Sequence, residues 1–322
     1  MNERLDIRYL EQTEHQDDGK EVIAGLTQEQ KTLPPRYFYD AKGSLLFEEI
    51  CQLPEYYPTR TEAAILKQYS RAMADSTNQC ELIELGSGSS TKTRYLLDAY
   101  HDRGYVYYSP IDVSHSILEA SAKDLLQQYP LLKVRGLVGT YDAALNNLPE
   151  PFLKHRMIVF LGSSLGNFSE AKCDCFLSNI QSVMNSRDYF LLGIDLQKPV
   201  SILEAAYNDS QGVTAAFNLN MLAHLNSLFD GNFQLNLFQH KAIYNVQQQQ
   251  IEMYLEAQEA HSVYLEKLNL DISFQEKETI RTEISRKFNL QQMQQKLEAI
   301  GLNLLQSYTD ANNWFGLMLL QK

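Results

Sequence analysis

The sequence predicts an α/β protein with a parallel, doubly wound sheet and a second, α+β module. Between residues 81 and 195, short apolar runs alternate with stretches of helical spacing, which is the order of strand–helix–strand units. Beyond residue 200 this order ends. Residues 200–228 have helical spacing, whereas 241–257 and 260–288 alternate in the manner of strands. We therefore expect a nucleotide-binding sheet followed by an inserted, antiparallel-rich module.

The elements of the predicted sheet can be placed by their apolar runs. These runs are the strand candidates 81–85, 106–111, 133–138, 157–161 and 188–194. Helical spacing recurs at 43–50, 62–74, 114–128, 169–184 and 289–300. Gly301 is well placed to end the last of these helices, and residues 302–307 and 315–320 are expected to close the sheet as a hairpin.

The N-terminal part and the domain boundaries complete this prediction. Residues 1–20 are expected to form a polar, partly helical lead-in, and 53–60 a rigid loop flanked by prolines. One domain should then comprise 61–196 and 288–322, and a substrate-binding domain should comprise 1–60 and 197–287.

The segment Glu84-Leu85-Gly86-Ser87-Gly88-Ser89 joins the first predicted strand to a helix. Its glycines allow a tight turn and close approach of the backbone to a ligand. Asp112, at the end of the next strand, could accept hydrogen bonds from both ribose hydroxyls of a nucleoside cofactor. A glycine turn in an unrelated α/β protein remains the alternative interpretation of this motif.

Two cofactors fit such a turn. A dinucleotide site requires a third glycine, which is missing from Gly86-Ser87-Gly88-Ser89-Ser90-Thr91, so a nicotinamide oxidoreductase is disfavoured. The acidic Glu84 suits a cationic ligand such as S-adenosylmethionine better than a phosphate. The motif therefore favours a Rossmann-like class I S-adenosylmethionine-dependent methyltransferase sheet.

Composition restricts the partners. The 322 residues carry a formal charge of −12, which argues against a nucleic-acid substrate and favours a small molecule. The polar N-terminus and the lack of a long apolar run predict a cytoplasmic protein without a membrane segment, and we expect a monomer. Cys173 and Cys175 lack a second pair or a nearby histidine, so no metal is expected.

Several segments together resemble one family. They are 33–40 (LPPRYFYD), 53–63 (LPEYYPTRTEA), 84–88 (ELGSG), 160–167 (FLGSSLGN), 212–218 (GVTAAFN), 251–253 (IEM) and 282–288 (TEISRKF). The chain resembles the L-histidine Nα-methyltransferases of ergothioneine biosynthesis from about residue 20 onward. This resemblance implies transfer of three methyl groups from S-adenosylmethionine to the α-amino nitrogen of histidine, which gives hercynine.

The resemblance also implies roles for matching positions. The methyl donor would be bound by Gly86, Lys92, Asp112, Thr140 and Tyr141. Thr140 stands where the family usually has an acid, so its contact with adenine would be uncharged. Histidine would be bound by Tyr56, Asn167, Tyr207, Glu283 and Ser285, with Phe47 and Met253 lining the pocket. Tyr39 would lie near the reacting amine, as the catalytic residue.

The chemistry of these side chains suits that assignment. Asn167 and Tyr207 can donate hydrogen bonds to a carboxylate, while Glu283 can accept the imidazole N–H and Ser285 can serve the other ring nitrogen. From spacing alone, Glu283 and Ser285 could equally be the solvated face of a strand. The rival functions are Nα-methylation of another aromatic amino acid, such as a tryptophan derivative, and non-catalytic binding of S-adenosylmethionine.

Overall fold

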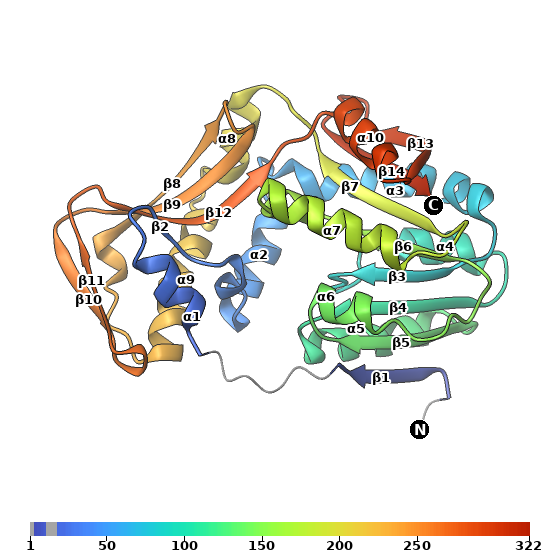
Figure 1. Ribbon diagram of the computed structural model, residues 1–322, viewed down its shortest axis with the longest axis horizontal. Coiled ribbons are helices and arrows are strands. Elements are labelled where there is room, and N and C mark those ends of the chain that lie inside the picture. The colour runs from blue at the N-terminus through green and yellow to red at the C-terminus, as the bar shows by residue number, and fades with distance from the viewer. Residues whose placement is uncertain (1–2, 11–17) are drawn as a thin grey trace. The chain divides into compact units, whose positions relative to one another are not determined.

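The computed structural model describes residues 3–10 and 18–322 (Figure 1). The chain divides into two compact units. The first takes in Met1–Glu14, Arg60–Leu196 and Phe288–Lys322, and the second takes in His15–Thr59 and Gln197–Lys287. Each unit is therefore assembled from segments that are far apart in the sequence.

The first unit is built on an eight-stranded sheet. From one edge to the other, its strands are β1 (Leu5–Tyr9), β5 (Leu132–Val138), β4 (Val106–Asp112), β3 (Glu81–Leu85), β6 (Arg156–Phe160), β7 (Tyr189–Asp195), β14 (Phe315–Gln321) and β13 (Asn303–Thr309). The pairings from β1 to β7 are parallel, whereas β14 runs antiparallel to β7 and to β13.

Helices cover both faces of this sheet, and side chains of successive strand residues enter opposite cores. Leu82 of β3 packs with residues of α3 (Tyr57–Thr77), α4 (Arg94–His101) and α5 (His115–Gln128). Its neighbour Ile83 packs on the other face, with residues of α6 (Tyr141–Asn146), α7 (Glu170–Val183) and α10 (Leu290–Ala299). A strand buried on both faces needs a continuous apolar run, which is why these strands were recognisable in the sequence.

The order of the strands locates the functional edge. From the central β3, the chain first builds β4 and β5 on one side and then returns to build β6 and β7 on the other. The connection therefore reverses direction beside β3. In open α/β sheets, ligands bind beyond the carboxyl ends of the strands at such a reversal. Gly86 and Gly162 follow β3 and β6 at this edge, and Asp112 ends β4.

The second unit combines a small sheet with helices. Its four-stranded sheet has the order β2 (Lys31–Thr32), β12 (Thr279–Arg286), β9 (Gln250–Ala257) and β8 (Phe238–Asn245). A separate pair consists of β10 (His261–Leu265) and β11 (Leu270–Phe274). The helices are α1 (Lys20–Leu26), α2 (Ala41–Gln52), α8 (Val200–Tyr207) and α9 (Val213–Phe229). Short 3-10 turns of this unit occur at Pro35–Phe38, Leu235–Leu237 and Glu266–Leu268, and the first unit has one at Ser164–Asn167.

Two predictions for the N-terminal third are wrong. The lead-in expected at 1–20 contains β1, which pairs in parallel with β5 and so extends the first unit's sheet, although 1–60 were assigned to the substrate-binding domain. Residues 1–2 and 11–17 of that segment lie outside the described residues. The loop expected at 53–60 gives way to helix at Tyr57, because Pro58 occupies the first turn, where a missing N–H costs no hydrogen bond.

The helices described by the structure include none with the length and hydropathy required to cross a lipid bilayer.

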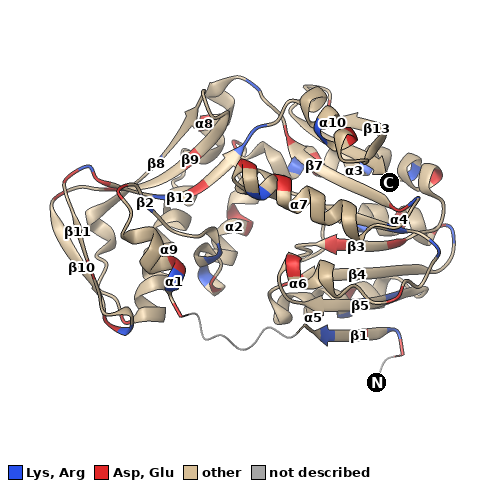
Figure 2. Cartoon of the chain, viewed as in Figure 1, with Lys and Arg blue, Asp and Glu red and all other residues tan. Residues whose placement is uncertain are grey.

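Figure 2 shows acidic residues at both ends of β3, which correspond to Glu81 and Glu84. Both side chains are buried.

Candidate active site

The glycine turn after β3 has the backbone geometry that the sequence predicted. Gly86 and Gly88 have φ angles of +71° and +48°, in the left-handed region that favours glycine. A Cβ at Gly86 would lie 2.6 Å from the Tyr141 hydroxyl oxygen, whereas a Cβ at Gly88 would meet no atom within 4 Å. One glycine thus gives room to Tyr141, and the other borders open space.

Asp112 is held against this turn. Its Oδ2 accepts a hydrogen bond from the Gly88 backbone N–H at 2.9 Å, and its Oδ1 accepts one from Ser114 N–H at 2.9 Å. A carboxylate can accept about four hydrogen bonds, so two lone pairs remain for a ligand. The fixed orientation fits the predicted contact with two ribose hydroxyls.

A further polar atom of the turn has no protein partner. Within the described part of the chain, the Ser87 hydroxyl oxygen is buried and forms no hydrogen bond. A buried hydroxyl without a partner is costly, and a polar ligand bound at the turn would remove that cost. Together with the open space at Gly88, this oxygen makes the turn suitable for the polar groups of S-adenosylmethionine.

Lys92 belongs to a buried ion pair beside the turn. Its ammonium contacts the carboxylate of Glu62, which has no exposed surface and also accepts from the Gly162 N–H at 2.8 Å. A Cβ at Gly162 would lie 3.5 Å from Lys92 Nζ. Glu62 therefore holds the lysine next to the loop after β6, a role for Glu62 that sequence reasoning missed.

Glu84 does not have the free carboxylate that its place before the turn suggested. Thr93 and Tyr108 each donate a hydrogen bond to it, and the side chain is almost fully buried. Burial raises the pKa of Glu84 to about 7. Both of its oxygens thus accept hydrogen bonds from neighbouring side chains in the protein interior. The predicted preference for a cationic ligand therefore cannot rest on this residue.

Thr140 and Tyr141 begin α6. Thr140 is the N-cap, and its hydroxyl oxygen accepts from Ala143 N–H at 3.3 Å, which leaves its own proton to donate. The Tyr141 ring packs edge-on against Phe160, and burial, with Asp112 nearby, raises the pKa of Tyr141 to about 12. Tyr141 therefore remains a neutral aromatic surface over Gly86.

The predicted substrate residues of the second unit form a continuous series of aromatic rings. Ring centroids are 5.8 Å apart for Tyr39 and Phe47, 6.4 Å for Phe47 and Tyr56, and 6.1 Å for Tyr56 and Tyr207. The ring centroid of Phe217 in α9 lies 5.9 Å from that of Tyr39. Phe217 is part of the family-like segment 212–218, but the sequence analysis assigns it no role. Such rings can stabilise a nitrogen that acquires permanent positive charge.

A bulge in β12 precedes Glu283. The register with β9 shifts between Arg281 and Glu283, and the residue between them, Thr282, is buried and donates to Asn218 Oδ1 at 2.7 Å. A bulge redirects the side chains that follow it. Glu283 pairs across the sheet with Met253, which is buried, so these two predicted pocket residues are neighbours.

The Glu283 carboxyl has no hydrogen-bond partner among residues 3–10 and 18–322. Although the residue as a whole is partly exposed, protein surrounds this group and raises its pKa to about 7; the nearby Lys287 opposes the shift. A solvated strand face would leave the pKa of a glutamate near its ordinary value. The surroundings of Glu283 therefore favour a binding role over that alternative.

Tyr207 and Ser285 form a cluster with Lys287, which was given no role in the sequence analysis. Tyr207 donates to Ser285 Oγ at 2.9 Å, and Lys287 Nζ donates to Ser285 Oγ at 2.8 Å and to the Tyr207 hydroxyl at 3.2 Å. The predicted donation from Tyr207 to a substrate carboxylate would require this proton to leave Ser285.

Side chains of the second unit hold Tyr207 in place through its backbone. His240 Nε2 lies 2.8 Å from the Tyr207 carbonyl oxygen, so this nitrogen carries the proton. Its Nδ1 then accepts from Asn218 Nδ2 at 2.9 Å. The next residue, Asn208, pairs with both backbone groups of Ala242, at 2.9 and 3.2 Å. The end of α8 is thereby fixed on β8.

Asn167 ends the 3-10 turn after β6 and belongs to the first unit. It does not cap the next helix, because Ser169 does so by accepting from Lys172 N–H. The described residues give its side-chain amide no hydrogen bond. Its amide is thus available for a ligand.

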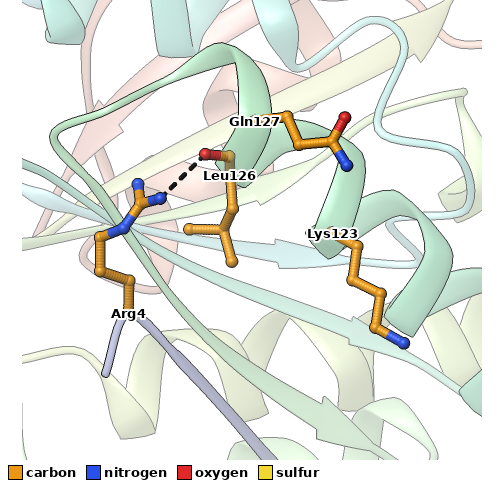
Figure 3. Close-up of a pocket in the computed structure, with 4 residues that line it drawn as sticks. All are labelled: Arg4, Lys123, Leu126 and Gln127. Carbon is orange, nitrogen blue, oxygen red and sulfur yellow. Dashed lines mark hydrogen bonds between the residues drawn. The ribbon is translucent and has the colours of Figure 1, made fainter. Parts of the chain in front are cut away.

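A surface depression of about 440 Å³ lies elsewhere on the first unit. Its lining consists of Arg4, Lys123, Leu126 and Gln127, and Arg4 donates to the Leu126 carbonyl at 3.1 Å (Figure 3). The three α5 residues belong to the end of the helix that leads into the start of β5, opposite the carboxyl edge of the sheet. None of the predicted site residues lines it, so we do not assign it to the active site.

A sequence model of the family described as "histidine-specific methyltransferase, SAM-dependent" matches residues 18–322. The chain belongs to this family. The class I S-adenosylmethionine-dependent fold and the methyl donor predicted from the sequence are thereby confirmed.

Individual proteins are similar to the chain to different degrees. It is 40% identical to the histidine N-alpha-methyltransferase of Mycolicibacterium smegmatis, over 93% of each chain. It is 32% identical to ergothioneine biosynthesis protein 1 of Schizosaccharomyces pombe, over 86% of this chain and 37% of that one. The 4-dimethylallyltryptophan N-methyltransferase easF of Aspergillus fumigatus is 31% identical, over 70% of this chain and 68% of its own.

Proposed function

We propose that this enzyme transfers three methyl groups from S-adenosylmethionine to the α-amino nitrogen of L-histidine and so forms hercynine, the first step of ergothioneine biosynthesis. The observation that carries the choice of histidine is the Glu283 carboxyl, which has no hydrogen bond to any described residue and lies two residues from Ser285 in the strand. Family membership and 40% identity to a histidine N-alpha-methyltransferase support the same choice.

The first unit would bind the methyl donor. Asp112 would accept from the ribose hydroxyls, Tyr141 would pack on adenine and Thr140 would contact its edge. Lys92 and the turn at Gly86 would hold the amino-acid end. When bound, S-adenosylmethionine supplies an electrophilic methyl carbon attached to its sulfonium sulfur. The sulfur is the leaving group and becomes a neutral thioether. The enzyme therefore needs to position a neutral amine in line with that bond rather than supply a strong base.

The second unit would bind most of histidine. Glu283 and Ser285 would bind the imidazole, and Met253, Phe47 and Tyr56 would enclose it. Asn167 of the first unit would donate to the carboxylate, whereas Tyr207, whose proton goes to Ser285, would hold that serine in place rather than donate to the carboxylate as predicted. Tyr39 is about half exposed, so water beside it can carry away the proton that the amine loses. The aromatic rings would stabilise the ammonium that forms as methyl groups are added.

The direct test incubates the purified protein with S-adenosylmethionine and each of the twenty amino acids, followed by mass spectrometry. A gain of three methyl groups on histidine alone is the expected result. The second candidate, methylation of a tryptophan derivative, is favoured by the similarity to the 4-dimethylallyltryptophan enzyme. An indole would not need both Glu283 and Ser285, and it requires more room beside the buried Met253. Turnover of 4-dimethylallyltryptophan above that of histidine would establish it instead.

A further inference from the structure

Lys287 directly follows β12 and lies on the same alternating series as Glu283 and Ser285. It is only 3% exposed. Its ammonium reaches both hydroxyls of the cluster, at 2.8 Å from Ser285 Oγ and 3.2 Å from the Tyr207 oxygen, and lies 4.9 Å from the centre of the Tyr207 ring. Burying a lysine side chain is costly, so its contacts with two predicted substrate residues suggest a role there.

The chemistry of the three groups fixes the direction of each hydrogen bond. A lysine ammonium has only donors, so both hydroxyl oxygens must accept from it. Tyr207 in turn gives its proton to Ser285 Oγ. The Ser285 oxygen then accepts two hydrogen bonds, which occupy both of its lone pairs. The only hydrogen-bonding capacity left to Ser285 is its own proton, which is free for a ligand.

Glu283 has the opposite polarity. An ionised carboxylate can only accept hydrogen bonds. Two residues apart on one strand, the chain therefore presents an acceptor and a donor. A neutral imidazole matches this pair, because one of its nitrogens carries a proton and the other does not.

We propose that Lys287 is a specificity-determining positioning residue. It holds Ser285 as a hydrogen-bond donor, so that Glu283 and Ser285 together bind a neutral imidazole through its N–H and its unprotonated nitrogen. The inference rests on the proposed function, because it takes histidine as the substrate. A ring with C–H in place of the unprotonated nitrogen leaves the Ser285 proton without an acceptor, and such a loss is costly in a buried site.

The test compares Lys287→Met with the wild type on three substrates. These are L-histidine, β-(pyrrol-2-yl)alanine and β-(pyrrol-3-yl)alanine; each pyrrole keeps one imidazole nitrogen as N–H and replaces the other by C–H. The wild type is expected to prefer histidine strongly. In Lys287→Met the Ser285 oxygen regains a free lone pair and can rotate, so the ratio of kcat/KM for histidine to that for the better pyrrole should fall about tenfold or more. The Kd of S-adenosylmethionine should stay unchanged.

A merely structural role would reduce turnover of all three substrates in equal proportion, and an unchanged ratio in Lys287→Met overturns the inference. Lys287→Gln is the matched variant, because it keeps an N–H donor without the charge. It should retain more of the preference than Lys287→Met, and it carries the test if Lys287→Met does not fold. Wild-type protein that leaves histidine unmethylated would instead refute the proposed function, whatever the variants do.

Discussion

Lys92 and Glu62 form an ion pair in which the carboxylate side chain has no exposed surface and the lysine side chain is 25% exposed. Removing one member of a buried pair leaves the other charge without compensation, at a cost of about 3–5 kcal/mol. We therefore expect Lys92→Met to lower the free energy of unfolding by about that amount, as measured by urea denaturation.

The double variant Lys92→Met/Glu62→Gln separates this structural role from binding of the methyl donor. Neutralising Glu62 should restore most of the lost stability. The Kd of S-adenosylmethionine, measured by calorimetry, should nevertheless stay at least tenfold above that of the wild type, because the proposed contact from Lys92 is still missing. Donor affinity that returns together with stability would show that Lys92 only supports the fold.

Asp112→Ala should weaken binding of the methyl donor far more than binding of histidine. Hydrogen bonds to a charged group contribute roughly 1.5–3 kcal/mol, so about a tenfold or greater rise in the donor Kd is expected. Calorimetry with S-adenosylmethionine measures this directly. Asp142, which lies in the first turn of α6, offers a matched control as Asp142→Ala. An unchanged donor Kd in the Asp112 variant would show that Asp112 does not bind the methyl donor.

Glu283→Ala should lower kcat/KM for histidine by about two orders of magnitude, because a hydrogen bond to a charged group is lost and the amine is displaced. The Kd of S-adenosylmethionine should stay unchanged. The preference for histidine over phenylalanine or tryptophan should also narrow. Steady-state kinetics on the three amino acids provides the measurement, with the exposed Glu276→Ala as the control. Near-normal turnover and selectivity would show that Glu283 does not bind the imidazole and lies on an ordinary solvated strand face.

The rate should also depend on pH. The kcat/KM for histidine is expected to rise from pH 6 to about 8.5, because the amine must be neutral to react and because Glu283, with a pKa of about 7, ionises in this range. In Glu283→Gln only the contribution of the amine remains, so the rise should be smaller. A flat wild-type profile would show that neither deprotonation limits the reaction.

Glu84 should make the stability of the fold pH-dependent. Its pKa is raised from 4.5 to about 7, so the folded protein binds a proton more tightly than the unfolded chain does. The resulting stabilisation is complete below about pH 4.5 and is lost as pH rises toward 7. Relative to Glu84→Gln, the wild type should lose about 3 kcal/mol across this range. Parallel urea titrations at several pH values test this, and a constant difference would contradict it.

The sequence predicted the sheet well because its strands are buried on both faces. Most residues of the strands from β3 to β7 are apolar, and the predicted bounds differ from the observed ones by at most one residue. The strand β1 was missed because it lies at the sheet edge, where its side chains need not be apolar.

The contacts within the candidate site were less predictable than its members. The glycine turn at Gly86 and the acid at Asp112 follow from local pattern. The pairing of Lys92 with Glu62 joins residues 30 positions apart, and the cluster of Lys287 with Tyr207 joins residues 80 apart. Spacing within a segment carries no information about such partners, because tertiary packing decides them.

The position of β14 bears on how the protein is made. This strand lies inside the sheet of the first unit, between β7 and β13, and residues 315–320 are all buried. During synthesis, β7 leaves the ribosome before the long segment Gln197–Lys287 and before β14. Until β14 arrives, the nascent chain has an open apolar strand edge, which is a site for self-association. Pairing with β14 closes that edge, so the sheet of the first unit is complete only after β14 has been made.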